Sequence, residues 1–170
     1  MSERTDNKAT RGYAARFGLF LARFCITAWI GAAALFVIVG ITEVTQSGFD
    51  STTKDRLVSV RFPAFYVCGA TLVSIGWLGA FAARDPISFP SNRRIVTLAI
   101  LAIVLATMSA DYFWIYQPLL KMVTPPGQAK PSSFRDYHEA SKWINLAGLV
   151  LCLLASVLVN WPPRVLEKPN

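Results

Sequence analysis

The chain has 170 residues, of which 54% are hydrophobic and 16% are charged, and its formal net charge is +7. Soluble domains hold about 45–50% apolar residues even when glycine is counted, so this composition argues against an ordinary soluble protein. The positive charge gives no case for nucleic-acid binding, because no basic helix face, zinc pattern or RNA-binding motif accompanies it.

Four apolar stretches follow one another along the chain and predict an all-α integral membrane protein. A helix needs about 20 mainly apolar residues to cross the hydrocarbon core of a bilayer. Two of the stretches contain no charged residue, and the other two contain one each, Arg23 in the first and Asp111 in the third. We therefore predict an antiparallel four-helix transmembrane bundle. Its domain covers residues 17–161, with helices near residues 17–40, 62–83, 94–117 and 141–161.

Lysine and arginine residues predict how these helices are oriented. A basic tail of residues 1–16, the loop between the second and third helices, and a tail of residues 162–170 together hold nine of them. The opposite side holds seven. The positive-inside rule then places both termini in the cytoplasm, with the bundle in a bacterial inner membrane. Arg23 lies within the first helix and can extend its long side chain toward the inner interface, beside anionic headgroups.

The two connections on the predicted outer side differ in character. Residues 43–61 can hold a short interfacial helix, with Ser51 as a possible N-cap and Asp55 in the first turn. The connection at residues 117–133 contains the sequence TPPGQAKP. Its prolines exclude a continuous helix and favour an extended, exposed loop. We expect residues 124–133 to be the most mobile external segment.

Polar residues gather at the predicted outer ends of the helices. His138, the only histidine, is followed at helical spacing by Ser141 and Asn145, so the three side chains share one face. Asp111 lies about 9 Å below the outer end of the third helix, a depth similar to that of Asn145. A carboxylate at this depth is costly unless it is paired or reached by water, and we predict His138 as its partner. The predicted outer polar cluster comprises Asp111, His138, Asn145, Ser141, Arg61 and Glu43.

Two interpretations of this cluster remain open from the residues alone. In the first, it is a structural clasp that locks the outer ends of the helices together. In the second, it is a small polar pocket for a proton, an ion or a ligand, because ionisable groups inside membranes commonly mark functional sites.

Small residues predict how the helices pack. Helices in lipid associate through small side chains and interhelical hydrogen bonds rather than through hydrophobic burial. The helical face that carries His138 continues through small residues, and the second helix offers a similar face, so we expect these two surfaces to meet. The predicted packing residues are Gly69, Gly76, Ala80, Gly148 and Cys152.

Three stretches of the chain resemble a known family: AWIGAAALF at residues 28–36, RFPAFY at residues 61–66 and FRDYHEASKWIN at residues 134–145. They look like the four-helix membrane proteins related to transmembrane protein 205, a domain family without an assigned biochemistry. The last motif of that family matches Phe134, His138, Ser141 and Asn145. The resemblance implies a four-pass membrane protein and supplies no catalytic residues. Some eukaryotic relatives are associated with drug resistance, which implies a transport-related role.

Enzyme signatures are missing, since the sequence contains no zincin motif, nucleophile elbow or phosphate-binding loop. The sequence therefore favours a protein without enzyme activity but leaves the question open, and a single chain has no predicted cofactor or metal site. Three functions remain: a structural or accessory protein that binds a partner, a small transporter or ligand-binding protein that uses Asp111 and His138, and a haem or metal protein formed by a dimer through His138. The predicted partners are the lipid bilayer and other membrane subunits or a second copy of the chain.

Overall fold

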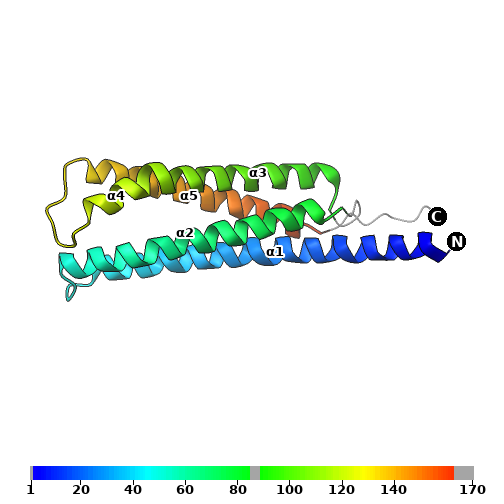
Figure 1. Cartoon of the computed structure of the whole chain (residues 1–170), viewed down its shortest axis with the longest axis horizontal. Helices are drawn as coiled ribbons and strands as arrows, with labels where there is room; N and C mark the ends of the chain where they lie inside the picture. Colours follow the sequence, from blue (N-terminus) through cyan, green and yellow to red (C-terminus); the bar gives the residue numbers. More distant parts are fainter. Residues whose placement is uncertain (1, 85–88, 163–170) are drawn as a thin grey trace.

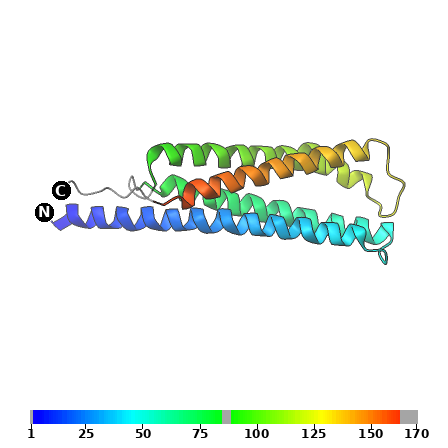
Figure 2. The same cartoon turned by 180° about the vertical axis from the view of Figure 1, so that it is seen from behind.

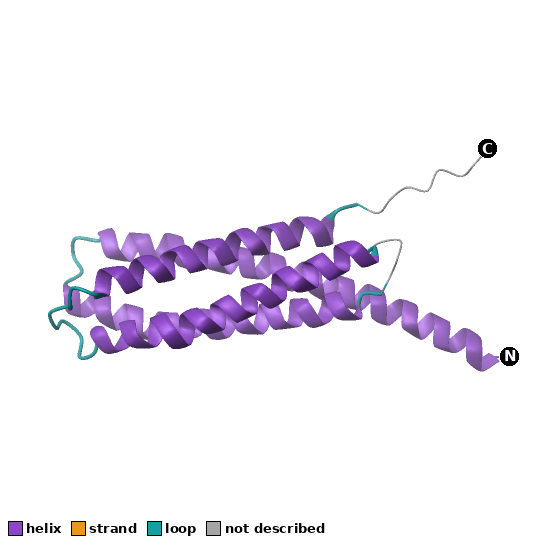
Figure 3. Cartoon of the chain, turned by 90° about the horizontal axis from the view of Figure 1, so that it is seen from above, coloured by secondary structure: helices purple, strands orange, loops and turns teal. Residues whose placement is uncertain are grey.

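The computed structural model describes residues 2–84 and 89–162, and it describes side chains from residue 12 onward within those ranges. These residues form helices and connections, and none of them lies in a β-strand (Figure 3). The predicted tail of residues 162–170 lies, apart from its first residue, outside the described part. The elements are α1 (Ser2–Thr45), α2 (Ser51–Ala82), α3 (Ser91–Ala110), the π-helix η1 (Asp111–Tyr116), α4 (Gln117–Met122) and α5 (Phe134–Asn160).

Four helical segments are long and apolar enough to cross a membrane, as the sequence predicts. α3, η1 and α4 follow one another without a break and form one of these segments. The prediction of an all-helical chain with four helices of membrane length is therefore confirmed within the described residues. The segments are Gly12–Thr45, Ser51–Ala82, Ser91–Met122 and Phe134–Asn160.

The chain runs back and forth along one long axis, so the four segments lie side by side (Figures 1 and 2). Their contacts form a ring, in which α1 packs against α2 and α5, and α3 packs against the same two helices. The N-terminal part of α1 extends past the other helices (Figure 3). Each long segment therefore has two helical neighbours and one outer face.

α2 is longer than the predicted second span because it begins well before the apolar stretch. Its N-cap is Asp50, whose carboxylate accepts a hydrogen bond of 2.8 Å from the backbone N–H of Thr53. Hydrogen bonding from Thr53 holds the pKa of the Asp50 carboxyl below its ordinary value. The helix then continues through Pro63, so the separate interfacial helix predicted near Ser51 is instead the first part of α2. Proline removes only one backbone hydrogen bond, and α2 contacts α1 on both sides of it.

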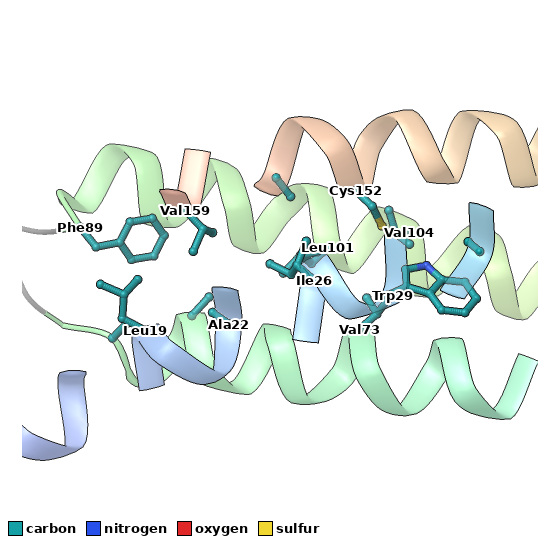
Figure 4. Close-up of a cluster of buried hydrophobic side chains, with 14 residues drawn as sticks. Leu19, Ala22, Ile26, Trp29, Val73, Phe89, Leu101, Val104, Cys152 and Val159 are labelled. Atoms are coloured by element: carbon teal, nitrogen blue, oxygen red, sulfur yellow. The ribbon is translucent and has the colours of Figure 1, made fainter. Parts of the chain in front are cut away.

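Apolar side chains from all four long segments fill the centre of the bundle (Figure 4). Ile26, Val73, Leu101 and Cys152, one from each segment, are almost completely buried. Large apolar side chains also cover the outer faces of the same helices. Helices that are apolar on all sides are typical of membrane spans, because lipid replaces water as the solvent of the outer face.

The backbones of α1 and α2 approach each other closely at glycine residues. A Cβ atom added to Gly79 would lie 2.6 Å from the carbonyl oxygen of Gly18, and one added to Gly18 would lie 2.7 Å from the carbonyl oxygen of Gly79. Gly69 lies against the ring of Trp29 in the same interface. The short connection between α1 and α2 makes them neighbours, and glycine lets their backbones come close.

The predicted small-residue face of α2 therefore packs mainly against α1, and not against α5 as the sequence predicted. Gly76 lies beside Ile26 of α1, and Ala80 is fully buried. On α5, Cys152 is fully buried in the core, but a Cβ atom added to Gly148 would meet nothing within 4 Å. Glycine spacing on α2 indicates that a helix packs closely there, but it does not identify which one.

Candidate functional site

A buried carboxyl group lies inside the bundle at the junction of α3 and η1, in the half nearer the α1–α2 and α4–α5 connections. Asp111 is fully buried, and its Oδ2 atom accepts three hydrogen bonds. The donors are the hydroxyl of Tyr66 at 2.5 Å, Nδ2 of Asn145 at 2.7 Å and the hydroxyl of Ser141 at 3.1 Å. We call these four residues the Asp111 cluster. It connects α2, η1 and α5 through side chains alone.

The local backbone explains how Asp111 reaches the interior. It is the first residue of η1, which winds as a π-helix from Asp111 to Tyr116. A π-helical turn inside an α-helix inserts an extra residue and changes the direction in which the next side chains point, and such turns occur frequently at functional sites. Here the turn places the side chains of Asp111 and Tyr116 both inside the bundle, although five residues separate them.

The two donors on α5 hold each other in position. Ser141 and Asn145 are one helical turn apart, and Nδ2 of Asn145 donates to the carbonyl oxygen of Ser141 at 2.9 Å. The same Nδ2 lies 3.2 Å from the Ser141 hydroxyl oxygen. Because each side chain restrains the other, α5 presents a preorganised pair of donors to the carboxyl group of Asp111.

Aromatic rings enclose the third donor. The ring of Tyr66 contacts Tyr112 and Tyr116 at centroid distances of 5.1 and 5.2 Å, and Phe62 stacks on Tyr116 at 5.7 Å. Phe62 lies nearer than Tyr66 to the start of α2, and Tyr116 lies nearer than Asp111 to the end of η1. Both therefore lie on the side of the α1–α2 and α4–α5 connections. The rings therefore separate the Asp111 cluster from the loop end of the bundle.

The hydrogen bonds leave part of the site unsatisfied. Oδ1 of Asp111 and the hydroxyl of Tyr116 are both buried without a hydrogen-bond partner. Each belongs to a residue that is at least nine-tenths buried. No lysine, arginine or histidine forms an ion pair with Asp111 in the part of the chain that the structure describes. The carboxyl group is therefore held by neutral donors only.

The predicted arginine and glutamate form a separate pair. Arg61 of α2 makes an ion pair with Glu43 near the end of α1, and its guanidinium carbon lies 4.6 Å above the ring centroid of Phe36. This contact places the positive charge of Arg61 between α1 and α2, whereas Asp111 lies between η1, α2 and α5. Of the predicted outer polar cluster, the structure brings together Asp111, Ser141 and Asn145, and separately Arg61 and Glu43.

His138 does not join either group, so the predicted pair of Asp111 and His138 is not formed. The imidazole ring is exposed and stacks on Phe134, with ring planes 5° apart and centroids 6.1 Å apart. Seven residues separate His138 from Asn145, which corresponds to about 10 Å along a helix. Since Asn145 lies level with Asp111, His138 must lie about two turns nearer the loop.

Tyr66 is the member of the site that sequence reasoning missed. The predicted outer polar cluster does not include it, because a tyrosine near the end of a span is commonly an interfacial residue. The available signal is its hydroxyl group, which reaches Oδ2 of Asp111 from α2. A tyrosine whose ring is packed inside a bundle needs a hydrogen-bond partner, and a buried carboxyl group at the same depth is the natural one.

A small cavity adjoins the cluster on the side of the hydrophobic core. Its volume is about 30 Å³, which is enough for one water molecule. Residues from all four long segments line it, including Trp29, Phe65, Met108 and Asn145. Asn145 therefore belongs both to the Asp111 cluster and to the cavity lining. Together with Thr107 it supplies polar side chains to a lining that is otherwise mainly apolar.

A second buried acid holds the proline-rich loop. Asp55 of α2 is 2% exposed, accepts a hydrogen bond of 3.0 Å from the backbone N–H of Gly127, and lies 2.9 Å from Nζ of Lys130. Gly127 has a φ of +85°, and a Cβ atom there would lie 2.5 Å from the hydroxyl oxygen of Thr52. The loop is exposed, as predicted, but it is attached to the first turns of α2.

The described residues contain no group of three histidine, cysteine, aspartate or glutamate side chains that could hold a metal ion. Cys25 and Cys152 are buried and Cys68 is exposed, and all three are free. Comparisons with protein-family models, curated proteins and solved structures give no match to this chain. The resemblance to the family related to transmembrane protein 205 therefore stays a prediction.

Proposed function

We propose that this chain is a four-pass integral membrane protein of a bacterial inner membrane, an antiparallel bundle with both termini in the cytoplasm. Its shortest candidate span has 27 residues, about 40 Å of helix, and the hydrocarbon core is about 30 Å thick. Exposed tryptophans support the placement, because Trp114 and Trp143 lie toward the predicted outer end and Trp161 at the inner end. Reporter fusions at both termini should report a cytoplasmic location, and an external C-terminus would contradict the topology.

We further propose that Asp111 binds and releases a proton. The observation that carries this proposal is a fully buried carboxyl group with three neutral donors on one oxygen and no partner on the other. An ionised carboxylate without a paired cation costs several kcal/mol in such surroundings. The three donors on Oδ2 reduce this cost, and the unpartnered Oδ1 offers a position for a proton.

The surroundings also favour a proton over a larger ligand. The groups that face the carboxyl are Tyr66 from α2 and Ser141 and Asn145 from α5, with further tyrosine rings of η1 behind Tyr66. None of them carries a charge at neutral pH. The adjoining cavity accommodates one water molecule, which leaves no space for an organic substrate. A proton needs no additional volume, and Oδ1 is free to carry it.

Infrared difference spectroscopy of the purified protein tests the proposal directly. Acidification should produce a carbonyl band of a protonated carboxyl group that disappears at alkaline pH, and this band should be missing from Asp111→Asn. Asp136→Asn, a change of an exposed residue at the start of α5, serves as the matched control and should keep the band. A band that persists at every pH, or no band that depends on Asp111, would contradict proton exchange at this site.

A structural or accessory role is the second candidate, and one observation favours it. The Asp111 cluster closes on itself, since three donors converge on one oxygen and two of them also bond to each other. Such a clasp fixes α2, η1 and α5 relative to one another without exchanging a proton. In that case the carboxyl group keeps one protonation state, and the protein contributes its fixed outer surface to a partner subunit.

A further inference from the structure

Arg23 lies at the level where the neighbouring helices end. Its Nε donates a hydrogen bond of 3.0 Å to the carbonyl oxygen of Val159, one residue before the end of α5. The nearby Gly18 contacts the last turn of α2, around Gly79. In the proposed membrane orientation, the end of α5 and the end of α2 mark the inner interface. Arg23 therefore lies beside phospholipid headgroups and not in the middle of the bilayer.

The hydrogen bond to Val159 uses only part of the arginine side chain. A guanidinium group has five N–H donors in one plane, and among the described residues only the donor on Nε has a hydrogen-bond partner. No carboxylate forms an ion pair with Arg23 in the part of the chain that the structure describes. The Nη groups are therefore available, and their planar arrangement suits the oxygen atoms of a phosphate group.

An apolar track leads away from the free end of this arginine. Phe20, Phe24, Thr27 and Ala28 line a shallow groove on α1 together with Arg23. The rings of Phe20 and Phe24 are stacked, with centroids 6.1 Å apart, and both are more than half exposed. Thr27 and Ala28 lie one turn farther into the membrane than Arg23. Phe24 lies level with Arg23, and Phe20 lies one turn nearer the N-terminus. The groove thus offers a cation at the interface with apolar surface beside it and one turn deeper.

We propose that this groove binds one anionic phospholipid, with its phosphate on Arg23 and an acyl chain along the apolar track. A free phosphate ion would use the guanidinium but not the phenylalanine surface, and a zwitterionic lipid would use the surface with less benefit from the charge. Arg16 lies two turns closer to the N-terminus on the same helical face and adds to the positive potential. The proposal depends on membrane insertion but not on proton exchange at Asp111.

Native mass spectrometry of the detergent-purified chain can measure this preference. We expect phosphatidylglycerol to bind about fivefold more tightly than phosphatidylcholine, since one basic residue near a charged surface contributes about 1 kcal/mol. Arg23→Gln should abolish the preference, and Arg23→Lys should retain part of it. Arg56→Gln is the matched control, because Arg56 is an exposed arginine at the opposite end of the bundle and its loss should change nothing.

Two further arms make the result decisive. Sodium phosphate at matched ionic strength should leave phosphatidylglycerol bound, and displacement by it would assign the site to free phosphate and overturn the proposal. If Arg23→Gln does not fold, the salt dependence of the wild-type preference decides the question, because an exposed guanidinium–phosphate contact weakens with screening. A preference that is absent, independent of salt, or unchanged in Arg23→Gln overturns the phospholipid site.

Discussion

The hydroxyl of Tyr66 donates a hydrogen bond of 2.5 Å to Oδ2 of Asp111, joining α2 to η1 inside the bundle. Both residues are buried, and Asp111 is fully so. In the membrane setting proposed above, such a bond competes with few alternative partners, because lipid offers none. This pair is therefore the connection on which we expect the geometry of the site to depend most strongly.

Tyr66→Phe and Asp111→Asn should each lower the stability of the detergent-solubilised protein, and their effects should not add. Each substitution breaks or weakens the same bond, so the double variant should lose less than the sum of the two. Interhelical polar contacts in membranes contribute on average about 0.6 kcal/mol and at most about 2 kcal/mol, and the coupling should fall in that range. Thermal unfolding measures it. Tyr112→Phe, which changes a ring next to Tyr66, is the control. Strict additivity of Tyr66→Phe and Asp111→Asn would mean that the bond between Tyr66 and Asp111 has no energetic role.

Tyr116→Phe, unlike Tyr66→Phe, should not lower the stability of the protein. The Tyr116 hydroxyl is buried without a partner, and a buried unsatisfied polar group costs about 1–3 kcal/mol. Replacing the tyrosine by phenylalanine removes that group and leaves the ring in contact with Phe62 and Tyr66. We expect the unfolding temperature to rise or stay unchanged. A clear loss of stability would mean that the hydroxyl is satisfied by a bound water molecule.

The spans and one half of the site could be predicted from the sequence because strong physical constraints act on them. A helix that crosses a bilayer must be long and apolar, so the positions of the four apolar stretches predict all four helices of membrane length. Asp111 and Asn145 were matched by counting helical rise from the outer ends of two helices. That count sets an approximate depth, and the hydrogen bond of 2.7 Å between them shows that the depths agree.

The rest of the site depended on quantities that the sequence does not fix. Counting along α5 cannot reveal the register between α5 and η1, and for this reason the predicted pair joins His138 to a carboxyl group about two turns away. The π-helical turn at Asp111 also has no clear signal in the residues, although it decides which side chains point inward. In the same way, Gly69 and Gly76 predicted close packing of α2, but the identity of the partner helix depends on how the chain folds back on itself.

Gly79→Ala and Gly148→Ala form a matched pair that tests the packing of the bundle. A methyl group on Gly79 would lie 2.6 Å from the Gly18 carbonyl oxygen, so α1 and α2 must separate. Overpacking of this kind typically costs about 1–3 kcal/mol. A methyl group on Gly148 meets nothing within 4 Å, and alanine favours a helix over glycine by about 1 kcal/mol. Thermal unfolding should show a loss for Gly79→Ala and no loss for Gly148→Ala, and equal effects would contradict this interface.

Asp55→Asn should release the proline-rich loop from α2. The substitution removes the ion pair with Lys130 and weakens acceptance from the Gly127 N–H, which together hold residues 123–133 against the first turns of the helix. A loss of about 1.4 kcal/mol in the closing of the loop raises the population of its open form tenfold, and cleavage follows that population when reclosing is fast. Proteinase K should therefore cut the loop of the variant about tenfold faster than that of the wild type.

Asp136→Asn, which changes an exposed aspartate of α5, should leave the rate unchanged. If the wild type and Asp55→Asn are cut equally fast, then Asp55 does not hold the loop, and the segment is as mobile as its prolines suggest.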